Sequence, residues 1–209
     1  MLSKFRKPAE PVVRPRRVPK VESTTWVEVP SDYTNAAKWT PSIGEYFPNF
    51  SGKSTDGKIT FHPYTNGHWT IFFSIAAVFS ETCTAELADL SEVQEDLRQE
   101  GVRLIGIARN SVDELNLWRD QVSQRSGFAV KVPILSDPEG ILTNTFGMIH
   151  PLQDDNATIR KTIIMDPRLR VSMIFEYPLY ISRSIEELLR TLDAARGHYE
   201  ETGHRQPRL

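Results

Sequence analysis

The chain of 209 residues contains only one cysteine, Cys83, so no disulfide can form within it. Disulfide frameworks belong to oxidising compartments, whereas a lone thiol suits a reducing one such as the cytoplasm. The five histidines are scattered, and neither a metal-type spacing of His and Cys nor a Gly-rich phosphate loop occurs. The sequence therefore predicts no bound metal and no cofactor.

Long apolar runs are also lacking. The longest one near the middle, residues 69–79, is interrupted by Thr70 and Ser74 and falls short of the about 20 residues that a bilayer span needs. No apolar block of the secretory type occurs near the N-terminus either. We therefore expect a cytoplasmic protein without a membrane span.

Basic residues are scarce outside the first twenty positions. Residues 1–20 hold seven Lys and Arg, one Glu and four Pro, and the other residues carry a net charge of −8 (18 basic, 26 acidic). No basic face for nucleic acid is therefore expected. An organelle-targeting signal in residues 1–20 is an alternative, because transit peptides are rich in arginine. The four prolines argue against it, since they disfavour the amphipathic helix that such peptides form.

Composition also limits the domain organisation. With 39% apolar residues, a chain of this length can bury one full core and is short for two independent domains. Residues 1–40 are polar and proline-rich without a sustained period, so we expect a disordered or extended tail and arm there. One folded domain is expected over residues 41–199, followed by a C-terminal tail over 200–209.

Strand and helix patterns alternate through the expected domain. Two short strands around Asp56-Gly57 predict a hairpin. Further strands are expected at residues 69–74, 103–108, 132–135, 161–165 and 172–175. Helices are expected at residues 84–100, after the capping boxes at 111–114 and 184–187, and from Asp137-Pro138 to Phe146. This order predicts an α/β domain of thioredoxin-like fold, in which helices flank a central mixed sheet.

Cys83 stands where a strand gives way to a helix. Ser80 is a good N-cap and would place Cys83 at the third helical position, where unpaired N–H groups and the helix dipole favour a thiolate. A lone cysteine is more often a small core residue, but Ser80, Glu81 and Thr84 make this junction polar. Because Glu81 and Glu86 oppose ionisation, an arginine from elsewhere must offset them. We expect a thiolate in a partly open pocket.

The residues around Cys83 resemble the active-site pattern of the peroxiredoxins. That pattern is Pro, three residues, Thr or Ser, two residues and the peroxidatic Cys, commonly followed by Thr-x-Glu-Leu. Residues 76–87 read Ala-Ala-Val-Phe-Ser-Glu-Thr-Cys-Thr-Ala-Glu-Leu, with Ala76 in place of the Pro. The similarity extends from about Ile43 to Ala195, and includes Pro-Ile-Leu-Ser-Asp-Pro at 133–138 and Ala-Thr-Ile-Arg at 157–160.

The resemblance implies a thiol peroxidase whose Cys83 thiolate attacks a peroxide and becomes a sulfenic acid. It also implies that Arg160 pairs with the thiolate and donates to the peroxide, and that Ser80 donates to the peroxide. Glu86 would orient an arginine, with Arg183 as a further member of the network. Because no second cysteine exists, an external thiol must reduce the sulfenic acid, which makes this a 1-Cys type. The family further implies a homodimer.

Two other interpretations stay open. A peroxiredoxin-fold redox sensor or interaction protein with weakened catalysis is slightly favoured by Glu81 and by Ala76, because a proline there would shield the pocket and limit backbone freedom. Arg160 argues against this interpretation, since a decayed site has little need for that cation. The third interpretation is a structural or interaction module whose basic tail docks on an acidic partner or a membrane.

Overall fold

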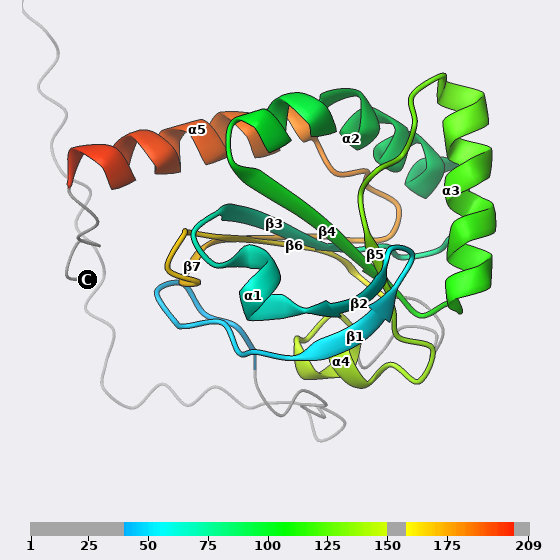
Figure 1. Ribbon diagram of the computed structural model, residues 1–209, viewed down its shortest axis with the longest axis horizontal. Coiled ribbons are helices and arrows are strands. Elements are labelled where there is room, and N and C mark those ends of the chain that lie inside the picture. Colours follow the sequence, from blue (N-terminus) through cyan, green and yellow to red (C-terminus); the bar gives the residue numbers. More distant parts are fainter. Residues whose placement is uncertain (1–39, 150–157, 203–209) are drawn as a thin grey trace, which may run out of the picture. The chain divides into compact units, whose positions relative to one another are not determined.

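The structure is a computed structural model that describes residues 40–149 and 158–202. The expected N-terminal tail and most of the expected C-terminal tail lie outside these residues. The described part contains a seven-stranded sheet with helices on both faces (Figure 1). None of its helices is long and apolar enough to cross a membrane.

The sheet is mixed and has the strand order β2-β1-β5-β4-β3-β6-β7 (Figure 1). Its strands are β1 (Ser51–Ser54), β2 (Gly57–Thr60), β3 (Trp69–Ser74), β4 (Val102–Ala108), β5 (Ile134–Ser136), β6 (Arg160–Met165) and β7 (Val171–Tyr177). β3, β4 and β5 pair in parallel, whereas β6 pairs antiparallel with both β3 and β7. Every residue of β3 is buried, which explains its nearly continuous apolar pattern. The predicted mixed sheet is confirmed.

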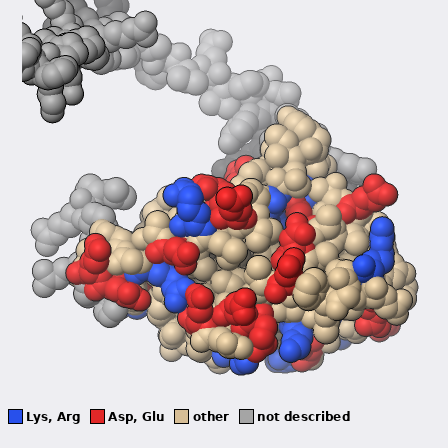
Figure 2. All heavy atoms as spheres, turned by 90° about the horizontal axis from the view of Figure 1, so that it is seen from above, with Lys and Arg blue, Asp and Glu red and all other residues tan. Residues whose placement is uncertain are grey.

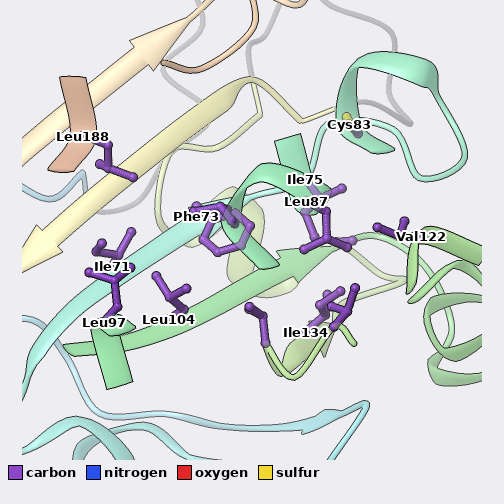
Figure 3. Packing of buried hydrophobic residues seen from close by; sticks show 14 of the residues in the cluster. Ile71, Phe73, Ile75, Cys83, Leu87, Leu97, Leu104, Val122, Ile134 and Leu188 are labelled. Atoms are coloured by element: carbon purple, nitrogen blue, oxygen red, sulfur yellow. The ribbon is translucent and has the colours of Figure 1, made fainter. Parts of the chain in front are cut away.

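Two apolar cores lie on opposite faces of this sheet. The helices are α1 (Phe61–Thr65), α2 (Glu81–Gln99), α3 (Val112–Ser126), α4 (Ile141–Thr145) and α5 (Ile185–Glu201). α2, α3 and α5 cover one face, where Leu104 packs in the same cluster as Leu87 and Leu188 (Figures 1 and 3). Successive strand residues point to opposite faces, so the neighbouring Ile105 joins Phe61 in the second cluster.

Acidic side chains dominate the helical face. Along α2 and at its C-cap, the exposed positions include Asp89, Glu92, Asp96 and Glu100. A view from above shows more acidic than basic side chains over these helices (Figure 2). This face therefore shows the excess of acidic over basic side chains that the composition outside residues 1–20 predicts.

Local signals at turns and helix starts are confirmed. The hairpin at Asp56-Gly57 forms between β1 and β2. Ser80 is the N-cap of α2, and Ser111 caps α3 in a full capping box with Glu114. Ser184 accepts from the third helical amide of α5, but only this half of the capping box predicted at 184–187 is present, and the Glu187 side chain pairs with Arg190. Each of these features depends on a few adjacent residues, which is why a pattern could predict it.

The predicted start of one helix and one predicted extended piece were wrong. α2 begins at Glu81 and not at residue 84, because the Ser80 hydroxyl accepts from the Cys83 amide and the helix starts directly after this cap. Residues 61–65 form α1, whereas an extended piece was predicted as far as His62. Pro63 is tolerated in α1 because the first-turn amides have no partner within a helix.

Two further boundaries differ around β5. The strand begins at residue 134 and not at 132, consistent with Pro133 having no N–H to offer to a strand ladder. Asp137 is not the N-cap of the next helix, since that position belongs to Gly140. The Asp137 carboxylate nevertheless accepts from the amides of Leu142 and Thr143, so it still stabilises the start of α4.

Candidate active site

The turn before α2 positions Cys83. The Ser80 hydroxyl donates to the carbonyl of Ala77 at 2.8 Å and accepts from the Cys83 amide at 3.2 Å. Phe79 has a φ of 65°, a left-handed conformation that is costly for a bulky residue. The chain thereby enters α2 directly after Ser80, and Cys83 occupies the third helical position, as the sequence predicted.

The sequence predicted that the thiol lies in a partly open pocket, and this prediction is wrong. The Cys83 side chain is 2% exposed and lies at the margin of the apolar cluster that contains Leu87 (Figure 3). Cys83, Glu86, Leu87 and Leu90 are all buried, and Glu86 and Leu87 each lie three or four residues from both Cys83 and Leu90. They therefore share the face of α2 that packs on the sheet.

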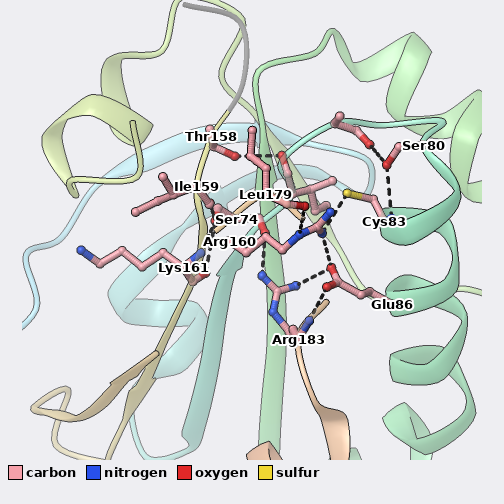
Figure 4. Close-up of polar contacts among 12 residues, drawn as sticks. Ser74, Ser80, Cys83, Glu86, Thr158, Ile159, Arg160, Lys161, Leu179 and Arg183 are labelled. Atoms are coloured by element: carbon pink, nitrogen blue, oxygen red, sulfur yellow. Dashed lines mark hydrogen bonds and ion pairs between the residues drawn. The ribbon is translucent and has the colours of Figure 1, made fainter. Parts of the chain in front are cut away.

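Arg160 binds the sulfur. Its Nη1 lies 3.3 Å from Cys83 Sγ and 2.8 Å from Glu86 Oε2, and its Nε donates to the carbonyl of Leu179 at 3.2 Å (Figure 4). Arg160 is the first residue of β6 and is 4% exposed. Because β6 pairs with β3, the guanidinium reaches the start of α2 from inside the protein.

Glu86 is a buried carboxylate between two arginines. Its Oε2 lies 2.8 Å from Arg160 Nη1 and 3.4 Å from Arg183 Nη1. Its Oε1 accepts from the backbone amide of Arg183 at 2.6 Å. A buried carboxylate is tolerated only with close cationic and N–H partners. Glu86 therefore joins α2, β6 and the segment before α5 at one point.

Arg183 closes the cluster from the segment before α5. Its Nη2 donates to the carbonyl of Ser74 at 2.9 Å, and its guanidinium lies over the ring of Phe73, 5.2 Å from the ring centre. Burial lowers the pKa of Arg183, and attraction to Glu86 opposes this shift. Two guanidinium groups face one carboxylate here, so the cluster carries excess positive charge next to Cys83.

Sequence reasoning missed two hydroxyl groups that fix the strand carrying Arg160. Ser74 Oγ donates to the carbonyl of Ile159 and accepts from the amide of Lys161 at 2.8 Å (Figure 4). Thr158 Oγ1 donates to the carbonyl of Ile75 at 3.0 Å. Both hydroxyl residues are buried. The signal in the sequence was Ser74, a polar residue within the apolar run that forms β3.

The structure thus brings together four of the five residues expected at the site: Cys83, Glu86, Arg160 and Arg183. Ser80 lies next to them but contacts the backbone of the turn and not the sulfur. Within residues 40–149 and 158–202, no group of three or more His, Cys, Asp or Glu side chains could hold a metal ion. A thiol at a helix start, beside an arginine from a later strand, defines a thioredoxin-like thiol protein.

The chain is similar to known proteins in sequence and in fold. Residues 43–174 match the model of the AhpC/TSA family. A peroxiredoxin of Hyperthermus butylicus is 32% identical over 154 residues, which cover 74% of this chain and 66% of that protein. A crystal structure of a mutant of peroxiredoxin 6 from Arenicola marina is 29% identical, with a TM-score of 0.70, over 74% of this chain and 73% of that one. A yeast mitochondrial 1-Cys peroxiredoxin is 26% identical, with a TM-score of 0.71, over 79% and 83%.

The chain belongs to the AhpC/TSA family, the peroxiredoxins. Peroxiredoxins are thiol-dependent peroxidases, and the single cysteine makes this chain a 1-Cys type by count. The match spans about two thirds of the length of the Hyperthermus butylicus relative. The family predicted from the motif around Cys83 is confirmed.

Proposed function

We propose that Cys83 is the peroxidatic residue of a thiol peroxidase that reduces hydrogen peroxide or organic hydroperoxides. The thiolate sulfur attacks one peroxide oxygen, so that an S–O bond forms while the O–O bond breaks. The departing oxygen takes up a proton and leaves as water or an alcohol. The sulfur is oxidised by two electrons to a sulfenic acid, and the peroxide is reduced by the same two electrons.

The observation that carries this proposal is the 3.3 Å contact between Arg160 Nη1 and Cys83 Sγ. A guanidinium at this distance stabilises the thiolate before reaction. It can also donate to the peroxide oxygens as negative charge moves onto the leaving oxygen. Glu86 and the carbonyl of Leu179 hold the guanidinium in place, so it needs little reorganisation during the reaction.

The other site residues have supporting roles in this proposal. Glu86 and Arg183 are positioning residues, because they act on the thiol through Arg160. Ser80 caps the helix that carries the thiol, and its hydroxyl can turn from the Ala77 carbonyl toward a bound peroxide. Because Cys83 is only 2% exposed, the protein must open around it to admit a substrate or a reducing thiol.

We propose an external thiol as the reductant. With one cysteine in the chain, the sulfenic acid must be attacked by a thiol from another molecule, which gives a mixed disulfide and water. A second thiol then releases Cys83 as a thiolate. The related yeast mitochondrial 1-Cys peroxiredoxin is resolved via the glutathione and thioredoxin systems, and we propose a thiol of this class here. The lone thiol supports a cytoplasmic site of action, and family membership supports a homodimer.

The redox-sensor alternative keeps its two supporting observations, Glu81 near the thiol and Ala76. Ala76 replaces the proline of the family pattern, and a sensor would need only slow oxidation of Cys83. Rate separates the two functions, because an activated thiolate reacts with peroxide far faster than an ordinary cysteine does.

Stopped-flow measurement of Cys83 oxidation by hydrogen peroxide tests the proposal. We expect fast oxidation in the full chain and none in Cys83→Ser. Arg160→Met should lose about 10²–10³-fold in rate, the usual loss when one preorganised donor is removed. The matched control is Arg190→Met, since Arg190 is an exposed arginine that pairs with Glu187 on α5. A rate equal to that of free cysteine in the unmodified chain would favour the sensor.

A further inference from the structure

A cavity of about 220 Å³ lies between α2 and α3. The start of α2 lies beside α3 (Figure 1), and the two helices are joined by the hydrogen bond from Trp118 Nε1 to Thr84 Oγ1. The cavity lining comes from the first two turns of α2 and the last turns of α3. A single water needs only about 10–15 Å³, so the cavity has room for a ligand of many atoms.

Small side chains on one face of α2 leave this space. Glu81, Ala85 and Ala88 are three or four residues apart and therefore share a face of the helix. The alanine side chains end at Cβ, so they do not fill the gap beside α3. Cys83 and Leu87 lie on the opposite face, which packs on the sheet. The cavity is therefore separate from the thiol.

Two opposite charges border the cavity, one on each helix. Glu81 belongs to α2 and Arg125 to α3, and both residues are exposed, so a ligand can reach them. Among the residues that the structure describes, neither side chain has an ion-pair or hydrogen-bond partner. The cavity thus has a free carboxylate on one wall and a free guanidinium on the other.

Thr84 adds a neutral donor to the same lining. Its Oγ1 accepts from Trp118 Nε1 at 3.1 Å, and Trp118 is buried, so the hydroxyl oxygen is fixed in place. Within the described ranges, the hydroxyl proton has no acceptor. A threonine hydroxyl can accept and donate at once, so this proton remains available to a ligand.

The charges narrow the chemistry of the ligand. A simple anion would be repelled by Glu81, and a simple cation by Arg125, whereas a ligand with both charges is attracted at both walls. We propose that this cavity binds a short zwitterionic peptide. The ammonium group of the peptide pairs with Glu81, its carboxylate pairs with Arg125, and the Thr84 hydroxyl donates to one of its oxygens. This binding is independent of the peroxidase reaction.

Glycylglycine is a suitable probe, because it carries both charges and no side chain. N-acetylglycylglycine lacks the ammonium charge, and glycylglycinamide lacks the carboxylate. An NMR titration of the full chain at constant ionic strength should give saturable shifts of the amides at residues 81–88 and 122–126. We expect a dissociation constant of about 1–10 mM for glycylglycine, and at least about threefold weaker binding of each other probe, because water screens exposed charge pairs.

Substitutions assign each charge of the peptide to its partner. Glu81→Gln should weaken glycylglycine binding about threefold, but should not weaken binding of N-acetylglycylglycine, which has no ammonium group. Arg125→Gln should weaken glycylglycine binding by a similar factor without weakening that of glycylglycinamide. Ala85→Leu, at an exposed position, fills the cavity and should abolish the saturable shifts. The matched control is Ala194→Leu at an exposed position of α5, which should leave the affinity unchanged.

A further variant separates this site from the proposed peroxidase. Cys83→Ser cannot react with peroxide, yet it should bind glycylglycine as tightly as the unmodified chain does. Three results would each overturn the proposal: no saturable shifts with glycylglycine, equal affinities for the three probes, or an unchanged affinity in Ala85→Leu.

Discussion

Glu86 and Glu95 lie nine residues apart on the same helix, and each faces two cations. The side chains of Glu86, Arg160 and Arg183 are 6%, 4% and 2% exposed. Those of Glu95, Arg98 and Lys131 are 39%, 59% and 67% exposed. The two ends of α2 therefore have similar charges in opposite surroundings.

The difference shows that burial, and not the number of ion pairs, decides what such a cluster does. Water screens the pairs of Glu95, so each contributes little to stability. At Glu86 water is excluded, so each charge depends on its partners, and the loss of one leaves the others buried and uncompensated. The buried end can therefore hold a guanidinium rigidly beside a sulfur, which the exposed end cannot do.

Among the substitutions that test this comparison, removing the charge of Glu86 should lower the free energy of unfolding the most. Glu86→Gln leaves Arg160 and Arg183 buried with no carboxylate, so we expect a loss of about 3–5 kcal/mol in the free energy of unfolding. Urea unfolding measures this loss. The oxidation rate of Cys83 should fall as well, because Arg160 loses the group that orients it.

Glu95→Gln is the matched control on the same helix. Its free energy of unfolding and its oxidation rate should stay close to those of the unmodified chain, because the Glu95 pairs are screened by water. Equal losses in the two variants would contradict the role that we assign to burial.

Ser74→Ala should have the next largest effect. The substitution removes the hydroxyl that donates to Ile159 and accepts from Lys161, and leaves a buried amide without its acceptor. We expect a loss of about 1–3 kcal/mol in the free energy of unfolding. Hydrogen exchange should accelerate at the start of β6. Unchanged protection of the Lys161 amide would show that this hydroxyl does not fix the strand.

The N-caps of α2 and α3 can be compared in the same way, with smaller expected losses of stability. Ser80→Ala and Ser111→Ala should each cost about 1 kcal/mol of stability, because both hydroxyls accept from an amide of the first turn. Only Ser80→Ala should also speed alkylation of Cys83 by iodoacetamide, since its hydroxyl bonds directly to the Cys83 amide and its loss loosens the chain next to the thiol. An opening that is easier by about 1 kcal/mol corresponds to about a fivefold rate increase. Equal alkylation rates in both variants would remove the link between this cap and access to the sulfur.

The smallest expected effect is the titration of Glu95. Hydrogen bonds from Arg98 and Gln99 lower the pKa of Glu95 to about 2. A lowered pKa in the folded state means that the ion pair stabilises the fold above the ordinary glutamate range and loses this contribution as pH falls toward 2. An NMR titration of the Glu95 carboxyl carbon should give this value at low salt and a higher one at high salt. A salt-independent value would indicate that water does not screen this end of α2.

Sequence reasoning succeeded where a feature depends on neighbouring residues. The cap at Ser80, the capping box at Ser111 and the hairpin at Asp56-Gly57 are each set by a few adjacent side chains. It failed at α1, because the burial of Phe61 beside Phe47, Phe50 and Phe72 is a tertiary contact. It also wrongly predicted that Cys83 is partly exposed. The polar residues at 80–84 indicated an open site, although the four-residue spacing of Cys83 and Leu87 places both on the buried face of α2.

The sequence by itself determined that one thiol stands at the start of a helix and that any resolving thiol must come from outside the chain. Only the tertiary structure decided that this thiol is buried and that two arginines meet at Glu86. The contacts of Glu86 with Arg160 and Arg183 join residues 74 and 97 positions apart. Strand pairing and helix packing bring such distant residues together, and local preferences along the chain contain no information about the directions in which their side chains then point.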